Sequence, residues 1–203
     1  MKITIIGAKV IGGTLARKWV AAGHTLAIGV RNTGNPEVQK LVRELGENAS
    51  LHTVDTAIAS GDVVVFAIPG SAMEETIKAH GRLLRGKIVI DAANKTGGKG
   101  MNSAAEFAQY APGAKVFRAF NNLGWENFDD PRFGETVADL LYCGPGDASQ
   151  AVMERLIEDI GLRPIRLGDL DKVHLADSVA EIWFALVFGQ RMGRRLAFKV
   201  LTK

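Results

Sequence analysis

Residues 2–13 read KITIIGAKVIGG, so an apolar stretch leads directly into a glycine-rich turn and then into a segment with helical periodicity. This order is typical of the first strand and helix of a dinucleotide-binding fold. In that fold one glycine forms the tight turn, and a later glycine lets the helix pack closely on the strand. Gly7 and Gly12 stand at these two positions. We therefore predict nucleotide contacts from the turn, namely from Gly7, Ala8, Lys9, Val10, Ile11 and Gly12.

Lys9 departs from the usual pattern, because it stands where a second glycine normally lets the backbone approach the pyrophosphate. Two interpretations stay open. Either the Cβ atom of Lys9 crowds the pyrophosphate, or its ammonium group pairs with a phosphate. The simplest alternative to both is that Gly7 and Gly12 only permit a tight turn and bind no nucleotide.

The end of the second predicted strand, Gly29-Val30-Arg31-Asn32-Thr33, indicates which dinucleotide is bound. A site for NAD usually has Asp or Glu here, about 20 residues after the glycines, to bind the ribose 2′-hydroxyl. This chain has no carboxylate at that place, and the Arg31 guanidinium can bind a 2′-phosphate through two donors. Asn32 and Thr33 offer further donors. We therefore expect NADP(H), bound in part by Val30, Arg31, Asn32 and Thr33, unless Arg31 is an ordinary solvated loop residue.

Three further strand ends are expected at the same edge of the sheet, where ligands of open α/β sheets bind. They read Ala67-Ile68-Pro69, Ala92-Ala93-Asn94-Lys95 and Ala119-Phe120-Asn121-Asn122. Pro69 is expected to form a wall against the cofactor, and the Asn amides can orient the nicotinamide carboxamide or a second ring. Asn residues also cap turns at strand ends, so each can be purely structural. The predicted contacts here are Ala67, Ile68, Pro69, Ala93, Asn94 and Asn121.

Apolar runs alternate with amphipathic segments along the chain, which is the pattern of repeated strand, helix, strand units around a parallel sheet. We predict an α/β fold with a doubly wound, mainly parallel sheet, as a single NADP-binding domain over residues 1–203 with a helical C-terminal cap at 171–203. Strands are expected over residues 2–6, 25–30, 51–54, 63–68, 88–91, 115–120, 138–143 and 164–167. Helices are expected over residues 11–22, 36–45, 56–60, 71–84, 103–110, 147–160 and 171–188.

The chain has 203 residues, which leaves no room for a large separate substrate domain. Its 47% hydrophobic and 23% charged residues are close to the globular average, which excludes a disordered chain, a collagen and a disulfide scaffold. The net charge of +3 includes five Lys and Arg residues after Gly189 and no acid there, so the rest of the chain carries −2. A nucleic-acid-binding protein usually spreads basic and aromatic residues over its body, so we expect no nucleic-acid partner.

Cys143 is the only cysteine, so the chain has no internal disulfide and no multi-cysteine metal site. The single thiol suits a reducing compartment, and the first residues read as a strand rather than a signal peptide. No apolar run approaches the ~20 residues that span a bilayer. We expect a cytoplasmic protein without a membrane partner or a metal, and a homodimer is one possible assembly.

Candidate acid–base residues are few. Of the four histidines, only His174, on the last predicted helix, is expected to be able to reach the cleft, and a surface or core position is the simpler interpretation. No Ser/His/Asp set and no metal-ligand cluster is evident in the sequence, so no catalytic residue is assigned. This agrees with hydride transfer between two rings, where the protein supplies distance and orientation. Trp125 and Trp183 are candidates to stack on a flavin-like ring, although Trp183 also suits a core position.

A succession of five short motifs resembles the deazaflavin-dependent NADP oxidoreductases (coenzyme F420 type) and their bacterial relatives. The motifs are Ile5-Ile6-Gly7, Gly29-Val30-Arg31, Ala67-Ile68-Pro69, Asp91-Ala92-Ala93-Asn94 and Ala119-Phe120-Asn121. The resemblance covers nearly the whole chain, including residues 161–164 and Met192-Gly193. It implies a Rossmann domain that binds NADPH, with a second planar cofactor or substrate stacked near the nicotinamide in a cleft that the C-terminal segment completes. It also implies that a hydride moves directly between the two rings.

The sequence thus predicts an NADP(H)-dependent oxidoreductase that transfers a hydride to a deazaflavin, a flavin or another small acceptor. The alternative is a protein that binds NADP(H) without turnover, as a redox sensor or regulatory subunit. An imine or keto reductase is a third class, which normally needs a proton donor and a larger helical domain. The basic C-terminal segment either carries solvated cations near a helix end or borders the acceptor pocket and attracts an acidic second ligand.

Overall fold

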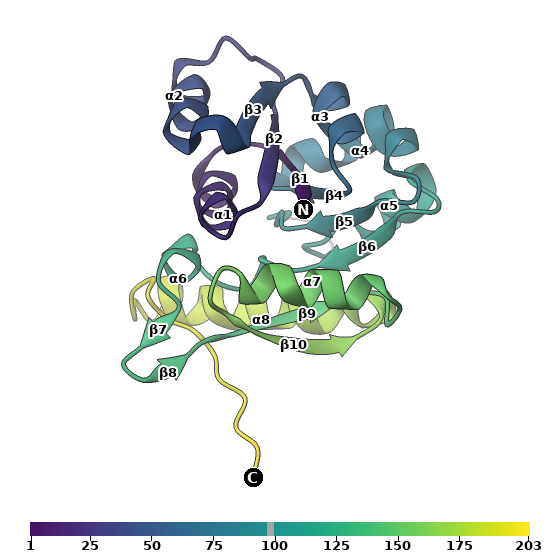
Figure 1. Ribbon diagram of the computed structural model, residues 1–203. Coiled ribbons are helices and arrows are strands. Elements are labelled where there is room, and N and C mark those ends of the chain that lie inside the picture. Colours follow the sequence, from purple (N-terminus) through teal and green to yellow (C-terminus); the bar gives the residue numbers. More distant parts are fainter. Residues whose placement is uncertain (97–99) are drawn as a thin grey trace.

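The computed structural model describes residues 1–96 and 100–203. Its centre is an eight-stranded sheet with the order β10-β9-β6-β5-β4-β1-β2-β3, accompanied by a hairpin of β7 and β8 (Figure 1). The six strands from β6 to β3 in this order are parallel. The strand order reverses at β1, which pairs with β2 on one side and β4 on the other. This is a Rossmann-like α/β fold, as the alternation of segments predicts.

The strands follow the apolar runs of the sequence. Their bounds are β1 (Lys2–Ile6), β2 (Thr25–Gly29), β3 (Ala49–His52), β4 (Val63–Phe66), β5 (Ile88–Asp91), β6 (Lys115–Arg118), β7 (Arg132–Phe133), β8 (Thr136–Val137), β9 (Asp139–Cys143) and β10 (Arg163–Gly168). The helices are α1 (Val10–Ala21), α2 (Pro36–Leu45), α3 (Val54–Ser60), α4 (Met73–His80), α5 (Ala104–Tyr110), α6 (Trp125–Asp129), α7 (Ser149–Glu158) and α8 (Val173–Phe184).

Several predicted bounds were wrong in detail. The third strand begins at Ala49 rather than at residue 51, and the strands predicted to reach residues 68 and 120 end at Phe66 and Arg118. The helix predicted over 71–84 is α4 between two 3₁₀ turns, and the last helix ends at Phe184 and continues as a π-type turn to Gly189. Helix α6 and the β7–β8 hairpin were not predicted, because both are too short to show a periodicity.

The parallel strands are buried on both faces, and alternate residues point to opposite sides. Ile3 and Ile5 of β1 belong to a cluster with α1, α2, α6 and α7, whereas Ile6 belongs to a second cluster with α3, α4 and α5. In the first cluster the Trp19 ring meets Phe120 edge-on at 5.7 Å, and Phe120 meets Phe128 in the same way. Helices therefore cover both faces of the sheet, which leaves the strand ends as the place for a ligand.

The two strands at the sheet edge differ from the rest. β9 and β10 are parallel to each other, but β9 is antiparallel to β6 and shares with it only the pair Arg118 and Cys143. Helix α7 packs against β10, and α8 packs against β9. In Figure 1 this group lies below the parallel strands, with the hairpin beside it. A single residue pair thus joins the ladder of β9 and β10 to the rest of the sheet.

The residues after α8, 189–203, form an irregular chain that we call the C-terminal segment. It lies along α6 and the start of β9: Arg194 Nε donates to Glu126 Oε1, Arg195 pairs with Asp130, and Phe198 bridges to Asp139. Arg194 and Arg195 are thus exposed cations that also form ion pairs with acids of the segment 125–130. None of the described helices is long and apolar enough to cross a membrane.

Candidate nucleotide site and adjoining cleft

The glycine turn after β1 is held by two close approaches of the backbone. Gly7 has a φ of +97°, which favours glycine, and its N–H donates to the carbonyl oxygen of Gly29 at 3.0 Å. A Cβ atom on Gly12 would lie 2.0 Å from the carbonyl oxygen of Gly7. Only glycine at position 12 therefore allows α1 to begin this close to the turn, in agreement with the role that the motif predicts for it.

The amino end of α1 has positive character. Lys9 is the N-cap residue, its side chain makes no capping hydrogen bond to the described residues, and the first turn of the helix carries no acid. Unpaired backbone N–H groups and the helix dipole make such an end suitable for a phosphate. The Lys9 side chain is exposed, and the residue lines the adjoining cavity. Its ammonium group can therefore reach an anion at this place.

A cavity of about 360 Å³ lies in front of this turn. Gly7, Ala8 and Lys9 form one side, and Val30, Arg31 and Asn32 after β2 form another. A third side comes from α4, which sequence reasoning did not include. The other lining residues are Ile6, Gly29, Asn35, Glu37, Val38, Val54, Ala67, Ile68, Pro69, Ala72, Glu75, Thr76, Ala79 and His80. The turn and Arg31, predicted to bind opposite parts of one nucleotide, thus share one cavity.

A smaller cleft of about 240 Å³ adjoins this cavity and shares the residues Ala67, Ile68 and Pro69 with it. It also contains four other predicted contact residues, Ile11, Ala93, Asn94 and Asn121. The remaining lining residues are Gly70, Ala92, Phe120, Leu123, Gly124, Trp183, Phe184 and Arg194. Trp183 and Phe184 come from α8 and Arg194 from the C-terminal segment, so the last part of the chain closes the cleft.

Polar atoms of the cleft are held in fixed orientations. Asn94 Nδ2 donates to the carbonyl oxygen of Asn121 at 2.8 Å, and Asn121 Nδ2 donates to the carbonyl oxygen of Ala176 at 3.4 Å. Asn121 is 4% exposed, and its Oδ1 atom has no hydrogen-bond partner among the described residues. A buried acceptor without a donor costs free energy. Because this oxygen has almost no accessible surface, a ligand N–H group can reach it only after the Asn121 side chain turns toward the cleft.

The outer wall of the cleft is aromatic and cationic. Phe184 and Phe188 are stacked with their centroids 5.9 Å apart, and Trp183 meets both rings edge-on. The Arg194 guanidinium lies 5.4 Å from the Trp183 ring centroid. The Trp183 indole N–H donates to the carbonyl oxygen of Leu196 at 2.8 Å, so the C-terminal segment also fixes this ring. Trp183 is thus both a core residue and a cleft residue.

Some predicted residues lie elsewhere. Val10 and Thr33 are exposed and do not line either cavity, and Gly12 serves helix packing. His174 is exposed on α8 and does not line the cleft, which agrees with the simpler interpretation of a surface position, whereas His80 lines the cavity in front of the glycine turn. Trp125 does not line the cleft either. Within the described part of the chain, no group of three or more His, Cys, Asp or Glu side chains is arranged to hold a metal ion.

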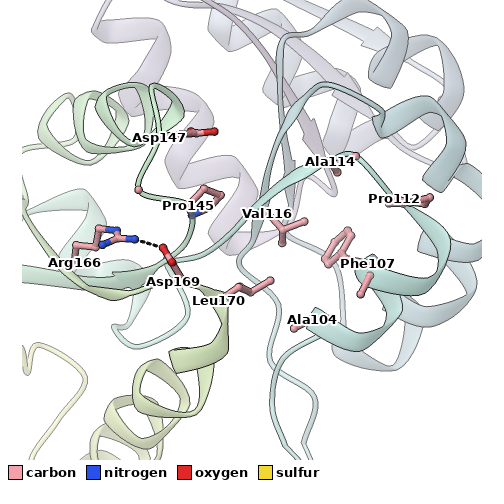
Figure 2. A pocket seen from close by; sticks show the side chains of 14 residues that line it. Ala104, Phe107, Pro112, Ala114, Val116, Pro145, Asp147, Arg166, Asp169 and Leu170 are labelled. Carbon is pink, nitrogen blue, oxygen red and sulfur yellow. Dashed lines mark hydrogen bonds and ion pairs between the residues drawn. The ribbon is translucent and has the colours of Figure 1, made fainter.

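A further cavity of about 840 Å³ is not part of this site (Figure 2). It lies between α5, the amino end of β6 and the turns after β9 and β10, where Phe107, Val116 and Leu170 form its apolar wall. Arg166 pairs with Asp169 at its polar end. None of the predicted site residues lines it. Ligands of open α/β sheets bind at the carboxyl ends of the strands, which is the edge that holds the other two cavities.

Comparison with known proteins gives matches to NADP-dependent reductases. Residues 2–95 match the profile of the family described as "NADP oxidoreductase coenzyme F420-dependent". The F420-dependent NADP reductase of Methanothermobacter thermautotrophicus is 26% identical to this chain, in an alignment that covers 95% of the chain and 94% of the reductase.

Solved structures show the same fold. A candidate F420-dependent NADP reductase from an Arthrobacter species superposes with a TM-score of 0.84 at 23% identity, over 100% of both chains. A reductive aminase from Aspergillus terreus, solved with NADPH and ethyl levulinate, gives a TM-score of 0.65 at 24% identity and covers 94% of this chain. The aligned part is 61% of the aminase, so this chain lacks a counterpart to the rest of that enzyme.

Proposed function

We propose that this chain transfers a hydride between NADP(H) and a deazaflavin, a flavin or another small acceptor, because residues 2–95 match the profile of the coenzyme F420-dependent NADP oxidoreductases and an F420-dependent NADP reductase is similar over 95% of the chain. The dinucleotide lies along the glycine turn and Arg31, with its nicotinamide at the start of the cleft. The acceptor lies deeper in the cleft, between the loop after β5 and helix α8.

One observation carries this proposal: the two cavities share the wall formed by Ala67, Ile68 and Pro69. A dinucleotide that fills the first cavity extends along this wall into the second. The cleft volume of about 240 Å³ accepts a ring system rather than a second dinucleotide. The cleft also contains Asn94 and Asn121, whose amides we expect to orient the carboxamide of the nicotinamide.

The lining of the cleft suits hydride transfer. When bound, the nicotinamide supplies the hydride, so the protein needs to provide only distance, orientation and exclusion of water. Arg194 is the only ionisable side chain among the described residues that line the cleft. The apolar side chains of Ile11, Leu123 and Phe184 keep water away from the reacting faces. An acid–base pair is not required for this reaction.

The choice of NADP(H) over NAD(H) rests on Arg31. This residue lines the nucleotide cavity beside Asn32, while Glu37, the nearest acid in sequence, begins the next helix. The Asn35 side chain caps that helix by accepting from the N–H groups of Glu37 and Val38. The Arg31 guanidinium is exposed at the cavity, where it can bind a 2′-phosphate through two donors.

The test is reduction of a panel of acceptors. Purified protein is mixed with NADPH and, separately, with coenzyme F420, FMN, FAD and a quinone, and the nicotinamide absorbance band is followed. We expect NADPH oxidation with at least one of the ring acceptors and a slower reaction with NADH. NADPH binding by calorimetry without oxidation by any acceptor would instead favour the redox sensor, and absence of binding would contradict both functions.

A further inference from the structure

Arg118, at the end of β6, is a fully buried charged residue outside the two cavities. Each of its five N–H groups has an acceptor. Nε donates to Asp177 Oδ1 at 3.0 Å, and Nη2 donates to Asn94 Oδ1 at 2.6 Å and to the carbonyl oxygen of Met101 at 3.3 Å. Nη1 donates to the carbonyl oxygens of Asp91 and Ala93. A guanidinium with all donors used is a rigid connector, because its fork is planar and fixed.

Four of these five contacts go to residues that follow or end β5, and these residues lead into one wall of the cleft. Ala93 and Asn94 line the cleft directly. Because Arg118 donates to Asn94 Oδ1, the amide of Asn94 is oriented with its Nδ2 toward the carbonyl oxygen of Asn121. The same guanidinium therefore fixes both the path of this wall and the orientation of its main polar side chain.

The fifth contact reaches the opposite wall. Asp177 lies on α8, six residues before Trp183, which is about 9 Å along the helix. Its second oxygen, Oδ2, accepts from Asn102 Nδ2 at 2.6 Å and from the Met101 N–H at 3.3 Å. The carboxylate of Asp177 thus ties the helix that carries Trp183 and Phe184 to the same loop and the same guanidinium.

We propose that Arg118 and Asp177 are positioning residues that set the separation of the two cleft walls, and therefore the distance between nicotinamide and acceptor. This inference rests on the proposed function. The ion pair itself is no argument for stability, because two buried charges lose their hydration. The two side chains matter instead because of where they make their contacts, which are with the loop after β5 in one wall of the cleft and with α8 in the other. A change of about 1 Å in such a distance lowers hydride transfer by about 100-fold without loss of the fold.

Asp177→Asn is the informative variant, since it keeps the shape of the side chain and the acceptor for Arg118 Nε. Its new NH₂ group faces two donors, Asn102 Nδ2 and the Met101 N–H, so the link between helix and loop is broken. The double variant Asp177→Asn with Asn102→Asp restores a donor and an acceptor on facing side chains and keeps the net charge. Glu181→Gln makes the same charge change on the exposed side of α8 and is the matched control.

The measurements are kcat and KM for the acceptor, the NADPH dissociation constant by calorimetry, and the kinetic isotope effect with NADPH deuterated at the transferred position. For Asp177→Asn we expect kcat to fall about tenfold or more, the isotope effect on kcat to rise, and the NADPH dissociation constant to stay within about twofold. We expect the double variant to recover most of the kcat of the unmodified protein. In Glu181→Gln all of these quantities should equal those of the unmodified protein. Arg118→Lys keeps the charge but offers only three donors, so we expect it to change kcat and the isotope effect in the same direction as Asp177→Asn.

Two results would overturn the inference. One is an Asp177→Asn protein with unchanged kcat. The other is a fall of kcat and NADPH binding together, in proportion to the folded fraction, with the isotope effect unchanged, since that is the behaviour of a merely structural residue. If the unmodified protein reduces no acceptor, the proposed function fails, and the inference is then judged by calorimetric binding of FMN and coenzyme F420 in the presence of NADP⁺. If Asp177→Asn leaves the affinity for FMN and coenzyme F420 unaltered, that result contradicts the inference.

Discussion

The carbonyl oxygen of Gly7 lies 2.0 Å from the point that a β-carbon on Gly12 would occupy. Gly13, the next residue, has its nearest such neighbour, the carbonyl oxygen of Ala8, at 3.5 Å, which is an ordinary contact. Two adjacent glycines in the first turn of α1 therefore tolerate a side chain very differently.

Gly12→Ala is expected to move α1 away from the turn. Overpacking of this kind lowers the free energy of unfolding by about 1–3 kcal/mol. It also displaces the backbone N–H groups that face the phosphates, so NADPH affinity drops. Gly13→Ala is the matched control: it should keep NADPH binding and gain up to about 1 kcal/mol, because Ala favours helices over Gly. Urea unfolding and calorimetry measure both quantities, and equal behaviour of the two variants would contradict the prediction.

Arg31→Ala is expected to remove most of the preference for NADPH over NADH. A charge-assisted contact through two donors contributes about 1.5–3 kcal/mol, so the unmodified protein should bind NADPH at least about tenfold tighter than NADH. Calorimetric titration with both nucleotides tests this. Arg43→Ala removes the same charge from an exposed position on α2 outside the cavity and should keep the preference. Equal affinities for NADPH and NADH in the unmodified protein would refute the assignment.

Lys9→Gly decides between the two interpretations of this residue. The exposed ammonium group at the amino end of α1 is free to approach a phosphate, so we expect the variant to bind NADPH more weakly. The difference between variant and parent should shrink in high salt, because ions screen an exposed charge pair. Tighter binding by the variant would show that the side chain obstructs the site, and no change would show that it points away.

Arg194→Gln tests the role of the C-terminal segment. It removes the guanidinium from the Trp183 ring and from Glu126, and it should raise KM for the anionic acceptors FMN and coenzyme F420 by about three- to tenfold, while a neutral quinone is affected less. NADPH binding should be nearly unchanged. Arg195→Gln is the control, because Arg195 also forms an ion pair, with Asp130 just after α6, but does not line the cleft. The kinetics of this variant should match those of the unmodified protein. Identical kinetics for all three proteins would exclude the segment from the site.

Acid should release the C-terminal segment. Burial alone would raise the pKa of Asp139, but hydrogen bonds from Arg163, the Val200 N–H and Lys199 outweigh it and lower the pKa below the ordinary 3.8. Because the folded-state pKa is lowered, the stabilisation is complete above 3.8 and is lost as pH falls through the folded-state pKa.

Hydrogen exchange of the Val200 N–H reports this release, since that group donates to Asp139 Oδ2 at 2.7 Å. Protection should be constant from neutral pH to about 5, decrease below 3.8 and disappear as pH falls through the lower folded-state pKa, while Asp139→Asn should show reduced protection at every pH. Protection that persists in the variant would mean that other contacts hold the segment.

Local sequence signals predicted which segments lie together around the cavity in front of the glycine turn. The turn at Gly7 and the strand end at Arg31 are set by residues close in sequence, and the carboxyl ends of parallel strands meet at one edge by geometry. The roles of Lys9 and Arg31 in binding stay predictions, because geometry alone does not test them.

The rest of the site depends on contacts that no periodicity shows. Arg118 interrupts an apolar strand pattern, which was a signal that could have been noticed, but its partner Asp177 is 59 residues away. Arg194 lines the cleft because the C-terminal segment is held against α6 by its pair with Glu126 and against α8 by the bond from Trp183 to Leu196. Helix α4 enters the nucleotide cavity through the packing of layers, so the inclusion of His80 could not be read from spacing.

The single residue pair between β6 and β9 has a consequence for how activity is lost. On either side of this junction the strands keep complete ladders of their own, and side chains such as Trp19, whose indole donates to the carbonyl oxygen of Leu156, span it. The junction is therefore held by side chains of one hydrophobic core rather than by a ladder of backbone hydrogen bonds. Because Trp183 and Ala93 line the cleft from its two sides, a large-to-small substitution in this core can alter the cleft while the strands on either side keep their own hydrogen bonds.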